Sequence, residues 1–540
     1  MNRRTLIKQL GMSIPAYLVA KQAGAFFPGD DAAIANGPFK PTWESLSGYA
    51  VPEWYRNAKF GIWAHWGPQC EPEYGDWYAR GMYEEGSGQY KYHVQKYGHP
   101  SKFGFKDVIN QWNADKWDPE YLVSLYKRVG AKYFFAMANH HDNLDLWDSK
   151  HQSWNSVKVG PKKNIIGGWA KAAKKAGLPF GVSVHASHAW NWLEVAQRSD
   201  KSGPMAGIPY DGNVTAADGK GKWWDGLDPQ ELYAQNHPLS KPGHHWEWGN
   251  GATPPSKAYC EKFLKRTIEL IDKYEPELIY FDDTVLPFHE LNDIGLQIVA
   301  HHYNRSIKRN KGKLQGVVNG KILNEQQRKC LVWDIERGQS NRLEPFTWQT
   351  DTCLGNWHYD QRVYENNWYK SAKTVVQTLV DVVSKNGNFL LNVPVKGNGS
   401  IDEKELVILE EVAAWMQVNS ECIYDTRPWK IFGEGPAISE AAAISAQGFN
   451  EGKGRPFGAE DIRFTQQGDT LYAIVYGWPE DRKVKIKSLA EGGSYRPAAI
   501  SKVEMPGAGQ LAFARNREYL EVTLPENKPA VTYALVLKIV

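Results

Sequence analysis

Short apolar runs alternate with helical patterns from about Phe39 to Met416, and no other feature constrains the fold of this chain more. Alternation at this length favours parallel strands joined by helices. Asp118 and Pro119 suit the start of one such helix, and Gly130 suits its end. We therefore predict a (β/α)8-like barrel. Only seven of its strands can be recognised: Phe60–Trp66, Tyr133–Ala138, Phe180–Val184, Leu278–Phe281, Val317–Val318, Leu331–Trp333 and Phe389–Val393.

A different pattern follows about Arg427, where short alternating strands are separated by turns and no helix signal is present. The clearest of these strands are Leu471–Trp478, Val484–Ile486, Leu520–Leu524 and Tyr533–Val540. Such a pattern is typical of a β-sandwich. A chain of 540 residues is also too long for one ordinary core. We predict a catalytic barrel over residues 39–426 and a C-terminal β-sandwich domain over 427–540.

The N-terminal residues 1–25 have the pattern of an export signal. Arg3 and Arg4 begin a basic stretch that resembles a bacterial twin-arginine signal, and a mildly apolar stretch and small residues follow. We predict an exported, periplasmic protein; the alternative is a basic N-terminus that is not translocated. No later segment reaches 18 apolar residues, so we expect no membrane span.

The net charge of +3 comes entirely from the basic N-terminal stretch, which carries no acids. A nearly neutral remainder gives no support for binding to nucleic acid or to anionic membranes. The five cysteines are dispersed and lack the spacing of zinc ligands. The 23 Trp and 27 Tyr fit a carbohydrate protein, because aromatic faces stack on sugar rings, although large cores also use them.

Asp282 follows the continuously apolar run Leu278–Phe281, which has the pattern of a parallel strand covered on both faces. Burying an unpaired carboxylate costs several kcal/mol. The carboxyl ends of barrel strands, by contrast, meet at the active-site face. We therefore predict that Asp282 is catalytic. Its neighbour Asp283 could instead cap the following helix.

Histidines also stand at strand ends: His65, His140, His141, His185 and His188. On one barrel they would share a mouth, where neutral imidazoles suit a ligand with many hydroxyls. Metal binding and purely structural roles are the alternatives. Adjacent His140 and His141 are expected to point to opposite sides of a strand, which does not match a known metal motif.

A second carboxylate is needed if Asp282 is a nucleophile, since retaining glycosidases hold two of them roughly 5 Å apart. Glu336, which follows the apolar run Leu331–Trp333, is the best candidate, and Asp334 is its competitor. Arg337 could instead hold Glu336 in a structural ion pair. Residues 198–255 lack periodicity but contain four tryptophans, so we expect this long loop to shape the substrate site.

Six segments, in the same order, resemble glycoside hydrolase family 29, the α-L-fucosidases, over a region from about Trp43 to Trp429. They are residues 59–67 (KFGIWAHWG), 75–78 (GDWY), 139–142 (NHHD), 276–282 (PELIYFD), 348–351 (WQTD) and 386–393 (NGNFLLNV).

The resemblance implies a retaining exo-hydrolase that releases terminal α-L-fucose from an oligosaccharide or polysaccharide and needs no metal or other cofactor. Asp282 would be the nucleophile, and Glu336 is our choice of acid/base on local grounds. The residues implied to contact the sugar are His65, His140, His141, His185, Asp76, Trp77, Tyr280 and Trp348.

Three departures from the family pattern leave other functions open. Gln349 stands where many members have Glu, and an amide cannot be a general acid. Asp76 replaces a Glu, and Asp283 replaces a Gly and adds a negative charge beside the nucleophile. One alternative is an α-L-galactosidase or a related exo-glycosidase, because discrimination against one added hydroxyl is often modest. A catalytically weak carbohydrate-binding protein is another, and a metal-dependent hydrolase is the third.

Overall fold

The computed structural model describes residues 34–234, 237–445, 448–496 and 498–540, so the predicted signal segment lies outside the described residues. Eight parallel strands close into a barrel in sequential order, with β8 beside β1. The predicted barrel is therefore confirmed. Its strands are β1 (Phe60–Ala64), β2 (Tyr133–Asn139), β3 (Phe180–Val184), β4 (Leu278–Thr284), β5 (Val317–Lys321), β6 (Val332–Glu336), β7 (Trp348–Cys353) and β8 (Gly387–Asn392).

The strand that the sequence did not reveal is β7, whose residues Gln349 to Thr352 are all polar. All are nevertheless buried, because the barrel interior supplies partners. The Gln349 side chain accepts hydrogen bonds from the hydroxyls of Tyr55 (2.8 Å) and Tyr133 (3.2 Å). It also donates to Asp334 at 2.8 Å. Such satisfied polar groups can occupy a core, but they carry no apolar signal.

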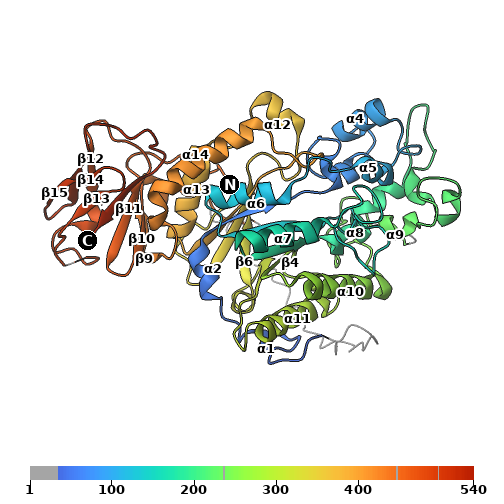
Figure 1. Cartoon of the computed structure of the whole chain (residues 1–540), viewed down its shortest axis with the longest axis horizontal. Coiled ribbons are helices and arrows are strands. Elements are labelled where there is room, and N and C mark those ends of the chain that lie inside the picture. The colour runs from blue at the N-terminus through green and yellow to red at the C-terminus, as the bar shows by residue number, and fades with distance from the viewer. Residues whose placement is uncertain (1–33, 235–236, 446–447, 497) are drawn as a thin grey trace, which may run out of the picture. The chain divides into compact units, whose positions relative to one another are not determined.

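Helices surround the barrel, and the larger ones begin and end as their caps require (Figure 1). The Asp118 side chain accepts from the backbone N–H of Tyr121, and Gly130 ends α6 in the left-handed region. The helices are α1 (Trp43–Leu46), α2 (Glu53–Ala58), α3 (Tyr78–Gly81), α4 (Gly88–Tyr97), α5 (Phe105–Gln111), α6 (Pro119–Val129), α7 (Ile165–Ala176), α8 (Ala189–Trp192), α9 (Pro229–Tyr233), α10 (Lys257–Tyr274), α11 (Ile294–Arg309), α12 (Gln361–Asn366), α13 (Ala372–Ser384), α14 (Glu403–Asn419) and α15 (Pro436–Ser439).

Two antiparallel sheets follow the barrel, in the orders β14-β13-β17-β11-β10-β9 and β12-β16-β15. Apolar residues of both sheets, such as Phe464 and Val522, share one buried core, which confirms the predicted sandwich. The one-turn helix α15 lies where no helix was predicted. The strands are β9 (Arg427–Glu434), β10 (Ile462–Gln467), β11 (Thr470–Val475), β12 (Lys483–Ile486), β13 (Val503–Met505), β14 (Gly509–Gln510), β15 (Ala512–Arg515), β16 (Leu520–Thr523) and β17 (Leu535–Ile539).

The sheet that contains β9 and β10 packs against α13 of the barrel (Figure 1). Trp415 on α14 donates from its indole to the carbonyl of Ala534 at 2.8 Å. Arg463 on β10 donates to Asp381 on α13 at 2.6 Å. Both bonds are buried, and they tie the sandwich to the outer helices of the barrel.

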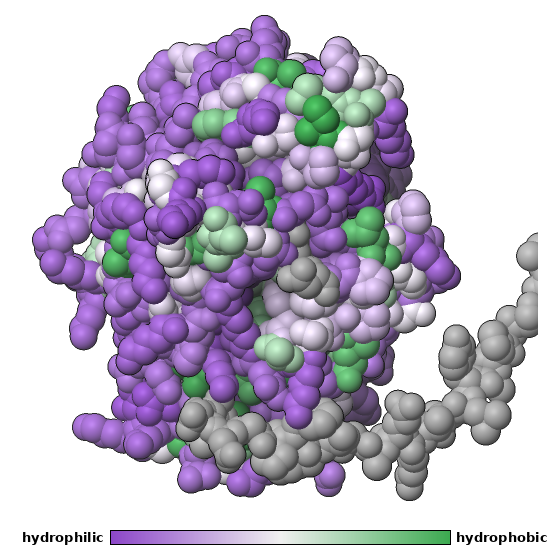
Figure 2. Space-filling view, turned by 90° about the vertical axis from the view of Figure 1, so that its right-hand side faces the viewer, coloured by the Kyte–Doolittle hydropathy of each residue, from purple (hydrophilic) through white to green (hydrophobic). Residues whose placement is uncertain are grey.

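The face shown in Figure 2 is largely hydrophilic, with apolar side chains scattered over it. Within the described residues, no helix combines the length and apolarity that crossing a bilayer requires. All five cysteines are buried and carry free thiols, so no disulfide contributes to the described fold.

Candidate active site

Asp282 lies at the carboxyl end of β4, in the mouth of the barrel, with 27% of its side chain exposed. Its Oδ2 accepts hydrogen bonds from His141 Nε2 and His185 Nδ1, both at 3.2 Å. Its Oδ1 accepts from Lys321 Nζ at 2.5 Å. The carboxylate is thus held by three donors from three neighbouring strand ends and remains open to the mouth.

These donors determine the ionisation of Asp282. Burial would raise the pKa of this carboxyl, but the Lys321 ammonium and the bonds from His141 and His185 outweigh burial and hold it well below its ordinary value. In turn, although burial lowers the pKa of Lys321, the carboxylates around it raise it well above its usual range. Asp282 is therefore an ionised carboxylate at neutral pH.

Glu336, at the end of β6, shares the same lysine. Lys321 Nζ donates to Glu336 Oε2 at 2.5 Å, so this oxygen and Asp282 Oδ1 lie no more than about 5 Å apart. The alternative that Arg337 would engage Glu336 is wrong, because Arg337 faces Glu451 at 3.5 Å. Glu336 is 19% exposed and lines the same cavity as Asp282.

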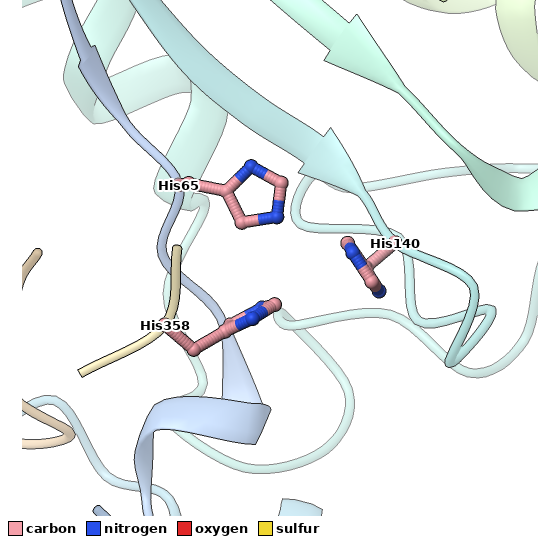
Figure 3. A group of neighbouring side chains, drawn as sticks. All are labelled: His65, His140 and His358. Atoms are coloured by element: carbon pink, nitrogen blue, oxygen red, sulfur yellow. The ribbon is translucent and has the colours of Figure 1, made fainter. Parts of the chain in front are cut away.

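Three imidazoles from separate segments surround one space in this mouth, namely those of His65, His140 and His358 (Figure 3). We call them the three-histidine group. All three rings are buried, and neither ring nitrogen of His65 or His358 has a hydrogen-bond partner among the described residues. Burial and the neighbouring imidazoles hold the pKa of His65 and of His140 well below the ordinary value, so both rings are neutral.

The expectation that His140 and His141 would point to opposite sides is wrong. Strand β2 ends at Asn139, and the chain turns at once, since the carbonyl of His140 accepts from the N–H of Asn143 at 3.0 Å. The side-chain alternation of a strand therefore stops before this pair, and their ring centroids lie 4.5 Å apart. Both side chains face the mouth.

Two sets of histidines are close enough to hold a metal ion: the three-histidine group, and His140 with His141 and His185. In the second set, His141 and His185 already donate to Asp282. The three-histidine group is the better candidate, because the ring nitrogens of His65 and His358 have no hydrogen-bond partner among the described residues, and imidazole nitrogens are good ligands for zinc. The same free nitrogens equally suit the hydroxyls of a sugar.

A buried network holds the loop that carries these histidines. Arg266 on α10 donates to both oxygens of Asp145 and, at 2.7 Å, to the Asn143 side chain. Asp145 also accepts from the Asn139 side chain at 3.0 Å. The buried guanidinium thus fixes the loop on both sides of its turn.

The cavity above these residues has a volume of about 450 Å³ and an aromatic wall. Of the predicted site residues, the cavity is lined by His65, Asp76, Trp77, His140, His185, Tyr280, Asp282 and Glu336. His141 contributes through its bond to Asp282. As expected, the long loop over residues 198–255 takes part, through Trp246 and Glu247.

Trp348 does not reach the cavity. It is the first residue of β7, three positions before Asp351, which does line the cavity, and this separation is about 10 Å along a strand. Its indole donates instead to the carbonyl of Lys385 at 2.8 Å. Asp334 and Gln349 are likewise buried inside the barrel, below the mouth.

Asp283 is not the cap of the next helix, since α11 begins at Ile294 after the N-cap position Asp293. Its carboxylate accepts from the Ser187 hydroxyl at 2.8 Å and lies 3.1 Å from His188 Nε2. Asp283, the neighbour of Asp282 in the sequence, therefore has its own partners, separate from those of Asp282.

Sequence reasoning missed three residues that lie against the cavity: Lys321, His358 and Asp351. Lys321 ends β5, but the apolar pattern marks only Val317–Val318 of this strand, so the sequence does not identify Lys321 as a strand-end residue. Asp351 and His358 lie on β7 or the loop after it, and β7 gave no apolar signal. His358 is placed by Asp76, whose Oδ1 accepts from the His358 backbone N–H at 2.7 Å.

Burial makes two carboxyl groups in and below the mouth, Asp351 and Asp334, differ from Asp282 in their pKa. Burial raises the pKa of Asp351 well above its usual range, with Asp334 adding to the effect, and it raises the pKa of Asp334 to about 7. Asp351 also accepts from the Tyr280 hydroxyl at 2.8 Å. The mouth can therefore supply an ionised nucleophile beside groups that bind or donate protons.

Comparison with known proteins agrees with this geometry. The alpha-L-fucosidase family model matches residues 28–421, and that of the alpha-L-fucosidase C-terminal domain matches residues 456–540. The tissue alpha-L-fucosidase of Rattus norvegicus is 24% identical over 508 residues, covering 92% of this chain and 90% of the rat protein. A structure of Thermotoga maritima alpha-fucosidase in complex with fucose has a TM-score of 0.67 at 25% identity, over 93% of this chain and all of that one. A Thermotoga maritima alpha-L-fucosynthase structure has a TM-score of 0.68 at 26% identity, over 94% of this chain and 100% of that one.

Proposed function

The chain belongs to the alpha-L-fucosidase family and is a fucose-releasing glycosidase, and we propose that it removes terminal α-L-fucose from glycans by double displacement at Asp282. The observation that carries the proposal is the pairing of Asp282 and Glu336 through Lys321. Retaining glycosidases place their two carboxyl groups about 5 Å apart, whereas inverting enzymes leave a wider gap for a water molecule. The limit of about 5 Å between the two oxygens falls in the retaining range.

In the first step Asp282 Oδ attacks the anomeric carbon, and the glycosidic oxygen leaves with a proton from Glu336. In the second step Glu336 takes a proton from water, which releases fucose from the ester formed with Asp282. Lys321 keeps Asp282 ionised before attack. Once the ester forms, Asp282 loses its charge, while Lys321 still holds Glu336 beside it through the bond to Oε2.

Glu336 is a better acid/base than the other two carboxyl groups because of its position. Although the pKa of Asp334, raised to about 7, would suit a general acid, its side chain lies inside the barrel, out of reach of a leaving group. Asp351 lines the cavity, but it is almost fully buried and accepts from Tyr280. Reach comes before pKa in assigning a general acid, and of these three acids Glu336 alone combines reach with partial exposure.

Sugar recognition would fall to the histidines and aromatic rings of the mouth. Within the three-histidine group, the rings of His65 and His358 offer nitrogens that have no hydrogen-bond partner among the described residues and can donate to or accept from hydroxyls. Trp63 and Tyr280 are buried against this space and supply apolar faces for the sugar ring. A pocket closed by the barrel interior accepts the end of a glycan chain, which fits exo-action.

The test is release of 4-nitrophenol from its α-L-fucoside by the purified protein. Asp282→Ala should abolish turnover, whereas Glu410→Gln, an exposed acid on α14, should leave it unchanged. Glu336→Ala should slow turnover severely and recover part of it with azide, which needs no general base. Trapping an ester with a 2-fluoro fucoside would identify the nucleophile by mass spectrometry. Full activity in Asp282→Ala would rule out the mechanism, and binding without turnover by the unaltered protein would indicate a sugar-binding protein.

Hydrolysis of α-L-galactosides is a second candidate, and His358 favours it. L-Galactose carries one hydroxyl more than L-fucose, and His358 places two unpaired ring nitrogens in the mouth. The extra hydroxyl would then gain a partner rather than enter an apolar pocket. Comparing kcat/KM for the 4-nitrophenyl α-L-galactoside and α-L-fucoside decides between them. A ratio that strongly favours the fucoside would remove this candidate.

We further propose that the protein is exported to the bacterial periplasm, where it meets fucosylated oligosaccharides or polysaccharides. Support comes from the twin-arginine-like N-terminal stretch. Replacing Arg3 and Arg4 with lysine should retain the protein in the cytoplasm of an expressing bacterium. Unchanged export of that variant would contradict the proposal.

A further inference from the structure

A second cavity, of about 630 Å³, lies on the other side of the wall that carries Glu336. It is bounded by residues 337–341 after β6, by α13, and by the segment that enters the sandwich at β10. None of the residues that line it belongs to the lining of the active-site cavity. It is therefore a separate space beside the catalytic mouth.

The lining of this second cavity is strongly cationic. Among its described residues, six basic side chains stand against two carboxylates, Asp381 and Glu451, and a third, Glu440, pairs with Arg455 at 2.8 Å from outside the lining. The basic residues are Arg337, Lys370, Lys373, Lys385, Arg455 and Arg463. Glu451 is shared between Arg337 at 3.5 Å and Lys370 at 3.3 Å. Lys373 forms no ion pair within the described part of the chain.

Part of the excess charge is buried. Lys385 and Arg463, both almost fully buried, donate to the single carboxylate of Asp381 at 2.5 and 2.6 Å. Two cations on one anion leave a net positive charge in a protein interior, which costs several kcal/mol unless something compensates. Consistently, burial lowers the pKa of Lys385, and Arg463 adds to the effect. An anion in the adjoining cavity would offset this charge.

The wall between the two cavities is a pair of short extended segments. The N–H of Phe449 donates to the carbonyl of Glu336 at 2.8 Å, and the N–H of Glu451 donates to that of Arg337 at 3.0 Å. Glu336 and Phe449 face the active-site cavity, whereas Arg337 and Glu451 face the second one. The consecutive residues Glu336 and Arg337 thus line different cavities.

Arg337 adopts a left-handed backbone conformation with φ of +44°. Such a conformation costs a residue other than glycine about 1–2 kcal/mol. The turn at Arg337 directs its side chain, 40% exposed, away from the mouth and toward the second cavity. An arginine thus stands where glycine would be less strained, which points to a use for its charge.

We propose that the second cavity binds a sulfate ester or carboxylate on the glycan to which the fucose is attached. This inference rests on the proposed function, in which Glu336 protonates the glycosidic oxygen. The leaving part of the glycan would then lie on the side of Glu336, and the cationic lining of the second cavity begins at the next residue, Arg337. Arginine and lysine bind sulfate and carboxylate through charge-assisted hydrogen bonds.

The kinetic test compares three fucosyl disaccharides that differ only in the second sugar: a neutral one, its sulfate ester and its uronic acid counterpart. We expect kcat/KM for at least one anionic disaccharide to exceed that of the neutral one about tenfold, the size of one partly solvated charge-assisted bond. The preferred anion identifies the source of the charge. Equal or lower values for both anionic substrates would overturn the proposal.

A double variant tests whether the preference for an anionic disaccharide arises in the second cavity. Lys373→Gln with Arg455→Gln removes two exposed cations from the lining, so the fold should be retained. We expect the anionic preference to fall to about the neutral value, while turnover of the neutral disaccharide stays unchanged. Lys174→Gln, an exposed lysine on α7, is the matched control and should keep the full preference. A preference that survives in the double variant would place the anion elsewhere and refute the assignment.

A binding measurement separates failure of this inference from failure of the proposed function. Calorimetry with a sulfated galactose disaccharide that lacks fucose, on the Asp282→Ala protein, needs no turnover. Binding that weakens about tenfold in the double variant would support anion binding in the second cavity even if fucosides are not hydrolysed. Failure to bind, together with normal turnover of the neutral fucoside, would leave the proposed function intact and overturn the inference.

Discussion

Replacing Lys321 with methionine should move the acid limb of the pH profile to higher pH. Lys321 lies between Asp282 and Glu336 and donates to each at 2.5 Å. Methionine retains most of the side-chain volume but removes the charge. Without the ammonium, the ionised form of Asp282 would lose the charge that stabilises it most, so this carboxyl would bind a proton more readily.

The structure sets the size of this effect. Opposite charges about 4 Å apart attract by about 4 kcal/mol at an effective dielectric constant near 20, which corresponds to roughly a thousandfold change in proton binding. If relaxation and solvent make up half of this lost attraction, roughly thirtyfold remains. Asp282 acts in its ionised form, and its lowered pKa keeps it ionised as the pH falls. Without Lys321, activity should be lost about one to two pH units earlier on acidification.

The assay is kcat/KM for 4-nitrophenyl α-L-fucoside as a function of pH, because this quantity reports the ionisation of the free enzyme. Lys321→Arg keeps the charge and should retain an acid limb close to that of the unaltered protein. A purely structural loss in Lys321→Met would lower the profile at every pH without moving its limb. Such an unmoved limb would refute the argument that Lys321 sets the ionisation of Asp282.

Three further results are expected. Gln349→Glu puts a second acid beside Asp334 in the barrel interior and should destabilise the protein by about 1–3 kcal/mol in urea unfolding without raising activity. A gain in activity would count against Glu336 as the acid/base. Zn²⁺ should inhibit competitively with fucose, and a chelator should reverse the inhibition, because the three-histidine group offers three imidazole ligands close together; inhibition unaffected by fucose would show that the metal binds elsewhere. Arg266→Met should cost about 3–5 kcal/mol in the free energy of unfolding, since Asp145 would be left buried and unpaired. Lys262→Met, on the same helix and partly exposed, should cost less than about 1 kcal/mol, and equal losses would contradict the argument.

The barrel could be predicted because its strands follow a simple rule. Strands buried on both faces are continuously apolar, as in Leu278–Phe281, and closure into a barrel places all their carboxyl ends together. This rule brought Asp282 and the strand-end histidines to one mouth without any knowledge of their contacts. It failed at β7, where Gln349 and Asp351 are buried by pairing with other polar groups. The same rule explains the error at Trp348, which begins a strand and so lies away from the mouth.

The ionisation of each acid could not be predicted from the sequence, because it depends on depth and on partners from distant segments. Asp282 follows an apolar run and Asp351 lies in a polar one, but neither pattern shows that Lys321 keeps the first ionised while burial raises the pKa of the second. The deciding group is a single cation, Lys321, and its role can be recognised only once β5 is known to lie between β4 and β6. Its place between two acids makes one side chain responsible both for the charge of the nucleophile before attack and for holding Glu336 beside it. Because one lysine joins the two acids, the Lys321 variants test how the nucleophile is kept ionised more directly than removal of either acid does.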